Sequence, residues 1–541
     1  MTKPYPWALQ PKILMKHNVP SRMYALPSYL RQPEVNIKGT NTEIEAGEAV
    51  KRALKGVAAL GVRQILVHGA NLTGSIILAR MLAPAQYGLF AIVNFLVLFL
   101  GTFGGTGLAA NLIREHTKPS REIYRAVYSF QQLFVVGFAA VLWFVSPHIG
   151  TLYHLGAPET LLFRITAISL VATTCMVPSQ IEMERHLDFT KLAAVETAQA
   201  LLFNVVTVVL AWKGFGVLSF GIGLLVRSIA GSILAIMLQP VKLGWNLDWS
   251  LASPHLRFGL FYQGSQIISV LKDSITPILI GMLFGPAGVG YISWSSVTAA
   301  YPILALVVLQ RLYLPLFAKL QQDLGHFGMV LEQIIWATNA FAAPLAVIEL
   351  VLIHPIITVI FGPKWLVALP LFYLFWTANL FAPTTVPVQT VLNALGRARL
   401  SMAIATMWMI LTWGIGWPLA VHEGIIGLAI ATAVVQVSSL VVYRIVQRHL
   451  HFRIARVIIV PWGLALAVGG TLWLVIRHKP PNSLTMLVAM ALPAILIYVL
   501  LLFWVQRERI IKIRQLMSGS SKGVSALSES QLFNSDVHEA L

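Results

Sequence analysis

The stretch from Arg63 to Val93, RQILVHGANLTGSIILARMLAPAQYGLFAIV, predicts an apolar helix, a short corner and the start of a second apolar helix. Proline cannot continue the first helix, and glycine gives the backbone freedom before the next one, so we place the corner at Ala83–Gly88. The same device returns later as FGPAGVG at 284–290, where Pro286 and Gly290 stand 202 residues after Pro84 and Gly88.

Two further short motifs recur at nearly the same offset and in the same order. VPSQ at 177–180 returns as VPVQ at 386–389, which is 209 residues later. Gly216-Val217 returns as Gly424-Ile425, which is 208 residues later. Three echoes with nearly one spacing indicate that the chain consists of two similar halves.

Composition places both halves in a membrane. Of the 541 residues, 57% are hydrophobic and 11% are charged, whereas a soluble globular chain carries about 25% charged residues. Apolar stretches of about 20 residues suit a bilayer, and they must be helices because backbone groups in lipid are satisfied within the segment. We predict an all-α, polytopic membrane protein of about 14 transmembrane helices, with two pseudo-symmetric six-helix bundles plus two C-terminal helices.

The order of apolar and polar stretches divides the chain into six parts. We expect a basic, mostly disordered tail at 1–55, rich in proline, and a polar tail at 506–541. Between them the sequence predicts a six-helix bundle at 56–240, an interfacial linker at 241–257, a second six-helix bundle at 258–447 and two additional helices at 448–505.

The distribution of Lys and Arg predicts the orientation. Net charge is +18, which in a soluble protein would suggest nucleic acid. Here the basic residues gather in the first tail and in the connections after every even-numbered predicted helix, while the opposite connections hold few. By the positive-inside rule both termini are expected in the cytoplasm, and we expect no nucleic-acid partner.

Sequence patterns for catalysis are missing from the chain. There is no HExxH and no phosphate-binding GxxxxGK[ST], and no connection on the outer side is long. The single cysteine, Cys175, allows neither an internal disulfide nor a cysteine metal cluster. We therefore expect no enzyme activity, no metal and no cofactor.

Polar residues within the predicted spans are the candidate site. Gln266, Lys272 and Asp273 lie in the span predicted at 258–284, and charges there are costly unless they line a cavity or pair. Lys272 and Asp273 are neighbours in sequence, so on a helix we expect each to need a separate partner. Asp273 is 202 residues after Asn71, so we expect the first helices of the two halves to face each other across a water-filled cleft. The alternative is that Asp273 only pins a helix by hydrogen bonding.

Two arginines complete the candidate set. Arg227 lies within a predicted span and Arg80 near the outer end of the first one, so either can serve an anionic ligand as a cationic group. An interfacial arginine is the alternative for Arg80. The predicted cavity residues are Asn71, Arg80, Arg227, Gln266, Lys272 and Asp273.

Several of these motifs resemble one family. LARMLAPAQYGLFAI at 78–92, VKRALKG at 50–56, the passage from Lys272 to Tyr291, and VPSQ with its following loop resemble the Wzx-like, or PST-type, oligosaccharide flippases. The resemblance covers about residues 50–505. It implies the superfamily that also holds multidrug antiporters and the lipid II flippase, with two six-helix bundles that form a V.

The resemblance also implies an activity and partners. The expected activity is to move an undecaprenyl-diphosphate-linked oligosaccharide across the inner membrane by alternating access, for surface polysaccharide synthesis. Lys272, Arg227 and Arg80 would then hold the diphosphate, and Asp273 would carry a coupling proton or tune Lys272. A polysaccharide polymerase and a chain-length regulator are expected partners besides membrane lipids. The alternatives are a cation-coupled multidrug or small-molecule antiporter, a lipid II flippase and, least favoured, a polymerase or ligase enzyme.

Overall fold

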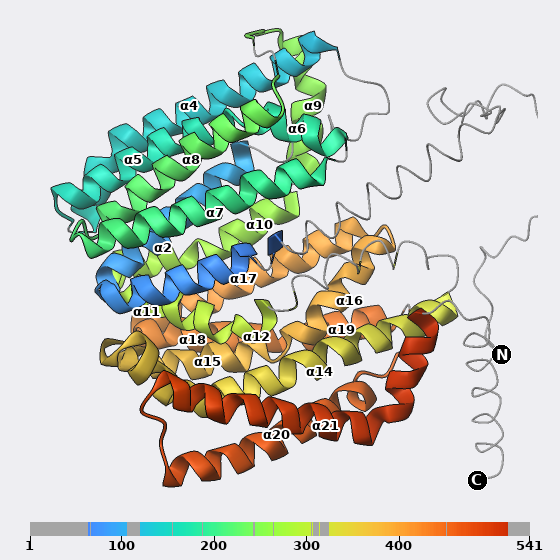
Figure 1. The fold of residues 1–541 in the computed structure, drawn as a ribbon. Helices are drawn as coiled ribbons and strands as arrows, with labels where there is room; N and C mark the ends of the chain where they lie inside the picture. Colours follow the sequence, from blue (N-terminus) through green and yellow to red (C-terminus); the bar gives the residue numbers. More distant parts are fainter. Residues whose placement is uncertain are drawn as a thin grey trace, which may run out of the picture. The chain divides into compact units, whose positions relative to one another are not determined.

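The computed structural model describes residues 63–104, 120–304, 306, 313, 317 and 324–517. Within these ranges, positions 65, 154, 187, 242–243, 263, 449 and 451 are not described. Every regular element in these ranges is a helix (Figure 1). Ten of the described helices are long and apolar enough to cross a membrane, or up to eleven if one bent pair is a single span. The predicted all-α membrane fold is confirmed, whereas the count of about 14 remains a prediction. The tail predicted at 1–55 lies outside the described residues, and so does the tail predicted at 506–541 from position 518 onwards. Residues 506–517 of that predicted tail are the last part of helix α21 (Leu484–Met517).

The first half forms a bundle around α5 and α8. Its helices are 66–81, α2 (Pro84–Gly104), α4 (Arg121–Leu152), α5 (Ala157–Thr174), α6 (Val177–Arg185), α7 (Phe189–Trp212) and α8 (Leu218–Leu238). α8 packs on α5 and on α7, and α5 packs on α4, as Figure 1 shows. Hydroxyl groups join these helices inside the bundle, since the Thr173 hydroxyl donates to the Ser228 hydroxyl at 2.7 Å.

The second half is more broken than the first. Its elements are α9 (Trp249–Tyr262), α10 (Gly264–Asp273), the π-helical turn η2 (Thr276–Ile280), α11 (Gly281–Ala299), α12 (Tyr301–Leu304), α14 (Leu324–Ile356), η3 (Ile357–Phe361), η4 (Pro363–Ala368), α15 (Leu369–Asn379), α16 (Ala382–Ala394), α17 (Ala398–Glu423), α18 (Ile425–Val437) and α19 (Ser439–Gln447). α9 begins inside the stretch expected to be a linker.

Two C-terminal helices pack on the outside of α14. They are α20 (Ile454–His478) and α21 (Leu484–Met517), and both contact α14. α21 changes direction at Gln506 and continues as a helix, held to α14 because the Trp336 indole donates to the Gln506 amide oxygen.

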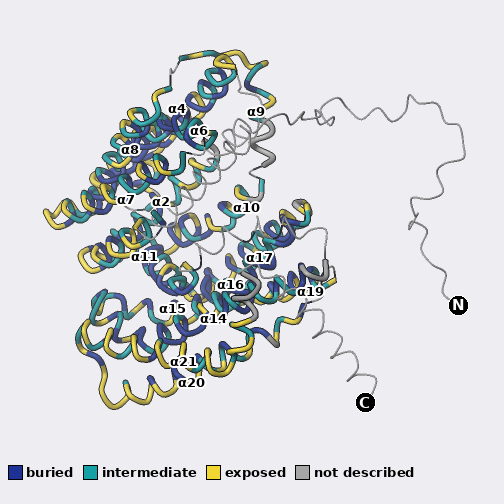
Figure 2. The backbone as a smooth tube through the Cα atoms, turned by 45° about the vertical axis from the view of Figure 1, so that its right-hand side comes forward, coloured by how far each residue is buried: buried dark blue, intermediate teal, exposed yellow. Residues whose placement is uncertain are grey.

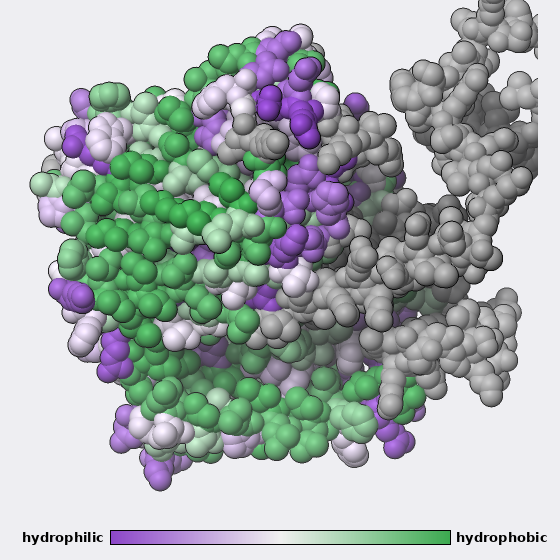
Figure 3. Space-filling model, turned by 45° about the horizontal axis from the view of Figure 1, so that its top comes forward, coloured by the Kyte–Doolittle hydropathy of each residue, from purple (hydrophilic) through white to green (hydrophobic). Residues whose placement is uncertain are grey.

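The surface is that of a protein surrounded by lipid. Large apolar side chains are exposed along many helices, for example Phe144, Trp212 and Trp504 at 75%, 78% and 77%. Figure 2 shows exposed positions along the outer helices and buried ones where helices meet. On the face drawn in Figure 3, a hydrophobic band covers most of the described surface, and hydrophilic residues gather towards its edges. Since monomeric soluble proteins rarely expose apolar patches of this extent, the band indicates a multi-pass membrane protein.

Candidate functional site

A cavity of about 780 Å³ lies between α2 of the first half and seven elements of the second half. The second-half elements are α10, η2, α11, α15, α16, α17 and α18. Its volume is in the upper part of the range for small-molecule sites, which is about 300–1,000 Å³. Among the described lining residues, those of the first half all belong to α2, and the others belong to the second half.

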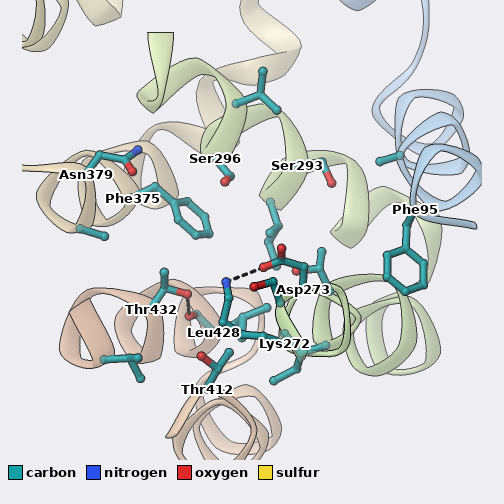
Figure 4. A pocket seen from close by; sticks show the side chains of 18 of the residues that line it. Phe95, Lys272, Asp273, Ser293, Ser296, Phe375, Asn379, Thr412, Leu428 and Thr432 are labelled. Carbon is teal, nitrogen blue, oxygen red and sulfur yellow. Dashed lines mark hydrogen bonds and ion pairs between the residues drawn. The ribbon is translucent and has the colours of Figure 1, made fainter. Parts of the chain in front are cut away.

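The cavity wall combines uncharged hydrogen-bonding groups with aromatic rings. Its polar, uncharged lining side chains other than tyrosine are Asn94, Ser269, Thr276, Ser293, Ser296, Asn379, Thr385, Gln389, Thr412, Thr432 and Gln436. Phe90, Phe95, Phe375 and Trp408 supply apolar faces. Figure 4 shows Ser293, Ser296, Asn379 and Thr412 arranged around the central space. Hydroxyls, amides and aromatic faces together suit a ligand that carries many hydroxyl groups.

Lys272 and Asp273 are the only charged residues among those described as lining the cavity, and they pair with each other. The Lys272 Nζ lies 2.5 Å from the Asp273 Oδ1, as drawn in Figure 4. The expectation that each needs a separate partner was therefore wrong. On a regular helix the side chains of adjacent residues do not face each other, but α10 ends at this point and the long lysine side chain turns back to its neighbour. Of the three cations expected to hold a diphosphate, only Lys272 lines the cavity, and the charge of Asp273 balances its own.

The end of α10 at this pair has a local cause. Pro277 lacks an N–H, and its ring would clash with the carbonyl of residue 273 in a regular helix, so the chain widens into the π-helical turn η2. Carbonyls at the break find donors from elsewhere: the Trp413 indole donates to the Leu271 oxygen at 3.0 Å. The break therefore places a cation and a carboxylate on the cavity wall, next to a local irregularity of the kind that often marks a hinge.

The repeated corners meet each other at one end of the cavity. A methyl group on Gly88 would overlap the carbonyl oxygen of Pro286, and a methyl group on Gly290 would overlap that of Pro84. The contact is reciprocal, because each glycine faces the proline of the other copy. Gly88 lies inside α2 and is used for this close approach, and not for backbone freedom as expected. In the second corner Gly285 has a φ of +65°, which makes the turn before Pro286.

Backbone carbonyls of each half accept hydrogen bonds from side chains of the other at the same end. The Lys364 ammonium donates to the carbonyl oxygens of Arg80 at 2.8 Å and Leu82 at 2.6 Å. In return, the Arg80 guanidinium donates to those of Val359 at 2.8 Å and Ile360 at 3.2 Å. We call this region, residues 79–88, 286–290 and 359–365, the closed end.

An aromatic cluster fills the closed end. Trp365 is fully buried, its indole donates to the Ala79 carbonyl at 2.9 Å, and its ring stacks on Trp294 with centroids 5.0 Å apart. Tyr87, which also lines the cavity, meets Trp365 edge-on at 5.3 Å. The two halves are therefore packed tightly together where the cavity stops.

A further contact between the halves lies beside it. The Tyr153 hydroxyl, at the end of α4, donates to the Pro277 carbonyl at 2.7 Å. A methyl group on Gly281 would overlap the Tyr153 ring. The bundle of the first half is thus attached to the broken helix that carries Lys272 and Asp273.

The structure brings only two of the six predicted site residues to this cavity, namely Lys272 and Asp273. Asn71 is not among the lining residues: its amide oxygen accepts from the Asn204 amide at 2.9 Å, within the first half. It does not face Asp273, because helix 66–81 packs its amide against α7. Arg80 belongs to the closed end.

The remaining two predicted residues lie away from the cavity wall. The Arg227 guanidinium lies over the Phe203 ring, 5.9 Å from its centroid, and Gln266 is exposed in the first turn of α10. Lys364, Trp365 and Tyr153 were missed. In the sequence they are marked only by their position in short connections on one side of the membrane, where basic and aromatic residues are ordinarily interpreted as interface residues.

Comparisons with known proteins agree with this architecture. Residues 77–370, more than half of the chain, match the model of a family described as polysaccharide biosynthesis protein. The chain belongs to this family. It is 23% identical to the lipopolysaccharide biosynthesis protein WzxC of Escherichia coli (strain K12) over 65% of this chain and 72% of the relative. It is 25% identical to the succinoglycan biosynthesis transport protein ExoT of Rhizobium meliloti (strain 1021) over 54% of this chain and 59% of the relative.

Among solved structures, the chain resembles the lipid II flippase MurJ in an inward closed conformation. The TM-score is 0.67 with 16% identity, covering 84% of this chain and all of that one. At this identity the likeness concerns the fold. The prediction of a Wzx-like member of the multidrug/oligosaccharidyl-lipid/polysaccharide exporter superfamily, a transporter and not an enzyme, is confirmed by the family and its relatives.

Proposed function

We propose that this protein is a flippase that moves a lipid-linked oligosaccharide across the bacterial inner membrane for surface polysaccharide synthesis. The observation that carries the proposal is a polar, hydroxyl- and amide-lined cavity that stops at a contact between the two halves. A sugar headgroup finds hydrogen-bond partners there, while its lipid tail remains in the bilayer.

The headgroup contacts follow from the lining. Asn94 on α2, Ser293 on α11 and Thr412 on α17 offer hydrogen bonds from three helices to sugar hydroxyls. Lys272 is the one cation on the described wall, so it is our candidate for the diphosphate of an undecaprenyl-diphosphate carrier. Asp273 holds the ammonium in place until a phosphate competes for it.

Translocation then requires the closed end to open. Its contacts are hydrogen bonds from the Arg80 and Lys364 side chains to backbone carbonyls, the glycine crossing and the packing of Trp365 on Tyr87. All of these contacts have to separate. The Lys/Arg pattern of the sequence favours cytoplasmic termini and places the closed end on the outer side. In this orientation the described conformation is closed towards the outside.

The test is complementation of a strain that lacks the gene. A plasmid copy with Lys272→Gln should reach the membrane at the normal level but leave surface polysaccharide strongly reduced, with lipid-linked oligosaccharide accumulating on the inner face. Lys479→Gln, an exposed lysine at the end of α20, is the matched control and should restore normal output. Normal polysaccharide in the deletion strain, with no second exporter present, would contradict the proposed function.

A further inference from the structure

Glu349 is a carboxyl group buried inside the second half, and one of its oxygens has no hydrogen-bond partner among the described residues. It lies on α14, two turns before Ile356, and is 8% exposed. Its Oε2 accepts no hydrogen bond, and no ion pair involves the residue among the part of the chain that the structure describes. A carboxylate in a membrane interior without a cation or donors is costly, so the group is held there as the neutral acid.

Hydroxyl groups lie between Glu349 and the other half. Tyr301 on α12 lies near the Glu349 carboxyl, and its hydroxyl lies beside the hydroxyls of Ser75 and Thr298. Ser75 belongs to helix 66–81 of the first half. α12 and α14 are packed together, and Figure 1 shows them adjacent. The environment of Glu349 therefore depends on where helix 66–81 stands.

Other titratable groups on the elements packed around α14 have different partners. His354, Tyr373 and Arg477 line a separate cavity of about 580 Å³ between α14, α15 and α20, the Tyr498 hydroxyl on α21 donates to the Ala340 carbonyl, and His478 is exposed at the end of α20. Within the described residues, Tyr301 is thus the titratable side chain that interacts with Glu349.

This cluster lies directly behind the closed end. On helix 66–81, Ser75 precedes Arg80 by five residues, and Arg80 binds the carbonyls of Val359 and Ile360. Those two residues belong to η3, which continues α14 from Glu349 onwards. When the closed end opens, helix 66–81 and η3 separate, and water gains access to Ser75 and Tyr301.

We propose that Glu349 is a proton-binding site that links protonation to the state of the closed end. The carboxyl binds one proton when the closed end is shut and releases it to water when the end opens and the group is hydrated. The shut state then holds more protons than the open state, so low pH favours closure and high pH favours opening. One linked proton changes the open-to-shut ratio by at most about tenfold per pH unit. The inference rests on the proposed function only in treating the closed end as a gate.

The experiment measures the closed end directly and needs no substrate. Spin labels are placed at Met81→Cys and Val367→Cys, which are 39% and 62% exposed on opposite sides of the closed end, in a Cys175→Ser background. Double electron–electron resonance on the full chain in liposomes gives the populations of short and long distances between pH about 5 and about 8.5. The long-distance population should rise with pH in the parent protein.

Glu349→Gln is neutral at every pH and should remain shut without a pH response, whereas Glu349→Asp should keep a response. Glu332→Gln, on the same helix at the contact with the Arg453 amide, is the matched control and should titrate like the parent. If Glu349→Gln does not fold, Tyr301→Phe takes its place and should shift the midpoint. A pH response identical in Glu349→Gln and the parent, or none in the parent, would overturn the proposal. Polysaccharide output in cells is scored separately, so failure here leaves the transport test standing.

Discussion

Removing the Lys364 ammonium should open the closed end. Lys364→Met keeps most of the side-chain volume but loses the hydrogen bonds to the Arg80 and Leu82 carbonyls, at 2.8 and 2.6 Å. Hydrogen bonds to charged groups contribute about 1.5–3 kcal/mol each, but the ammonium is only half-buried, so solvent screening reduces the pair to about 1–2 kcal/mol. This loss corresponds to about a 5- to 30-fold rise in the open-to-shut ratio.

The spin-label pair at positions 81 and 367 measures this ratio at one fixed pH. Lys213→Met is the matched control, because Lys213 is exposed at the end of α7 and should leave the distances unchanged. An unchanged distance distribution in Lys364→Met would refute the idea that carbonyl capture by lysine holds the two halves together. An equal change in both variants would point to a general loss of positive charge.

Three further substitutions test the packing. Gly88→Ala adds a methyl group that overlaps the Pro286 carbonyl, so it should weaken closure by about 1–3 kcal/mol in the same distance measurement, whereas Gly101→Ala on the same helix has open space and should be silent. Tyr153→Phe removes one donor and should lower the free energy of closure by about 1 kcal/mol; a change above 3 kcal/mol would show that more than this bond was lost. Asn71→Ala should lower the free energy of unfolding of the purified protein by about 0.6 kcal/mol and leave polysaccharide output normal. Loss of output in this variant would show that Asn71 takes part in transport.

The sequence was informative about the fold because its strongest signals are periodic and repeated. Apolar stretches of membrane length, and the Pro84 corner that returns at Pro286, are properties of the chain alone. The first break of the second half was visible only as one proline. Its widening into a π-helical turn, and the Tyr153 and Trp413 side chains that donate to carbonyls beside it, appear only in the fold.

The site was less predictable because equivalence in sequence is not equivalence in environment. Asn71 and Asp273 occupy matching positions, yet helix 66–81 turns Asn71 towards α7 while the broken helix turns Asp273 into the cavity. The partners of Lys364 are backbone carbonyls, which every residue has, so no pattern of side chains reveals them. Glu349 is an acid near the end of an apolar stretch in the sequence, and only the packing of the helices shows that it is buried.

The reciprocal crossing at Gly88 and Gly290 has a consequence for how the two copies of the repeat can change. Each glycine lies directly against the proline carbonyl of the other copy, so a larger residue at either glycine would obstruct the same crossing. A larger residue at either glycine is therefore tolerated only if the corner of the other copy also changes, so the two duplicated segments must evolve together.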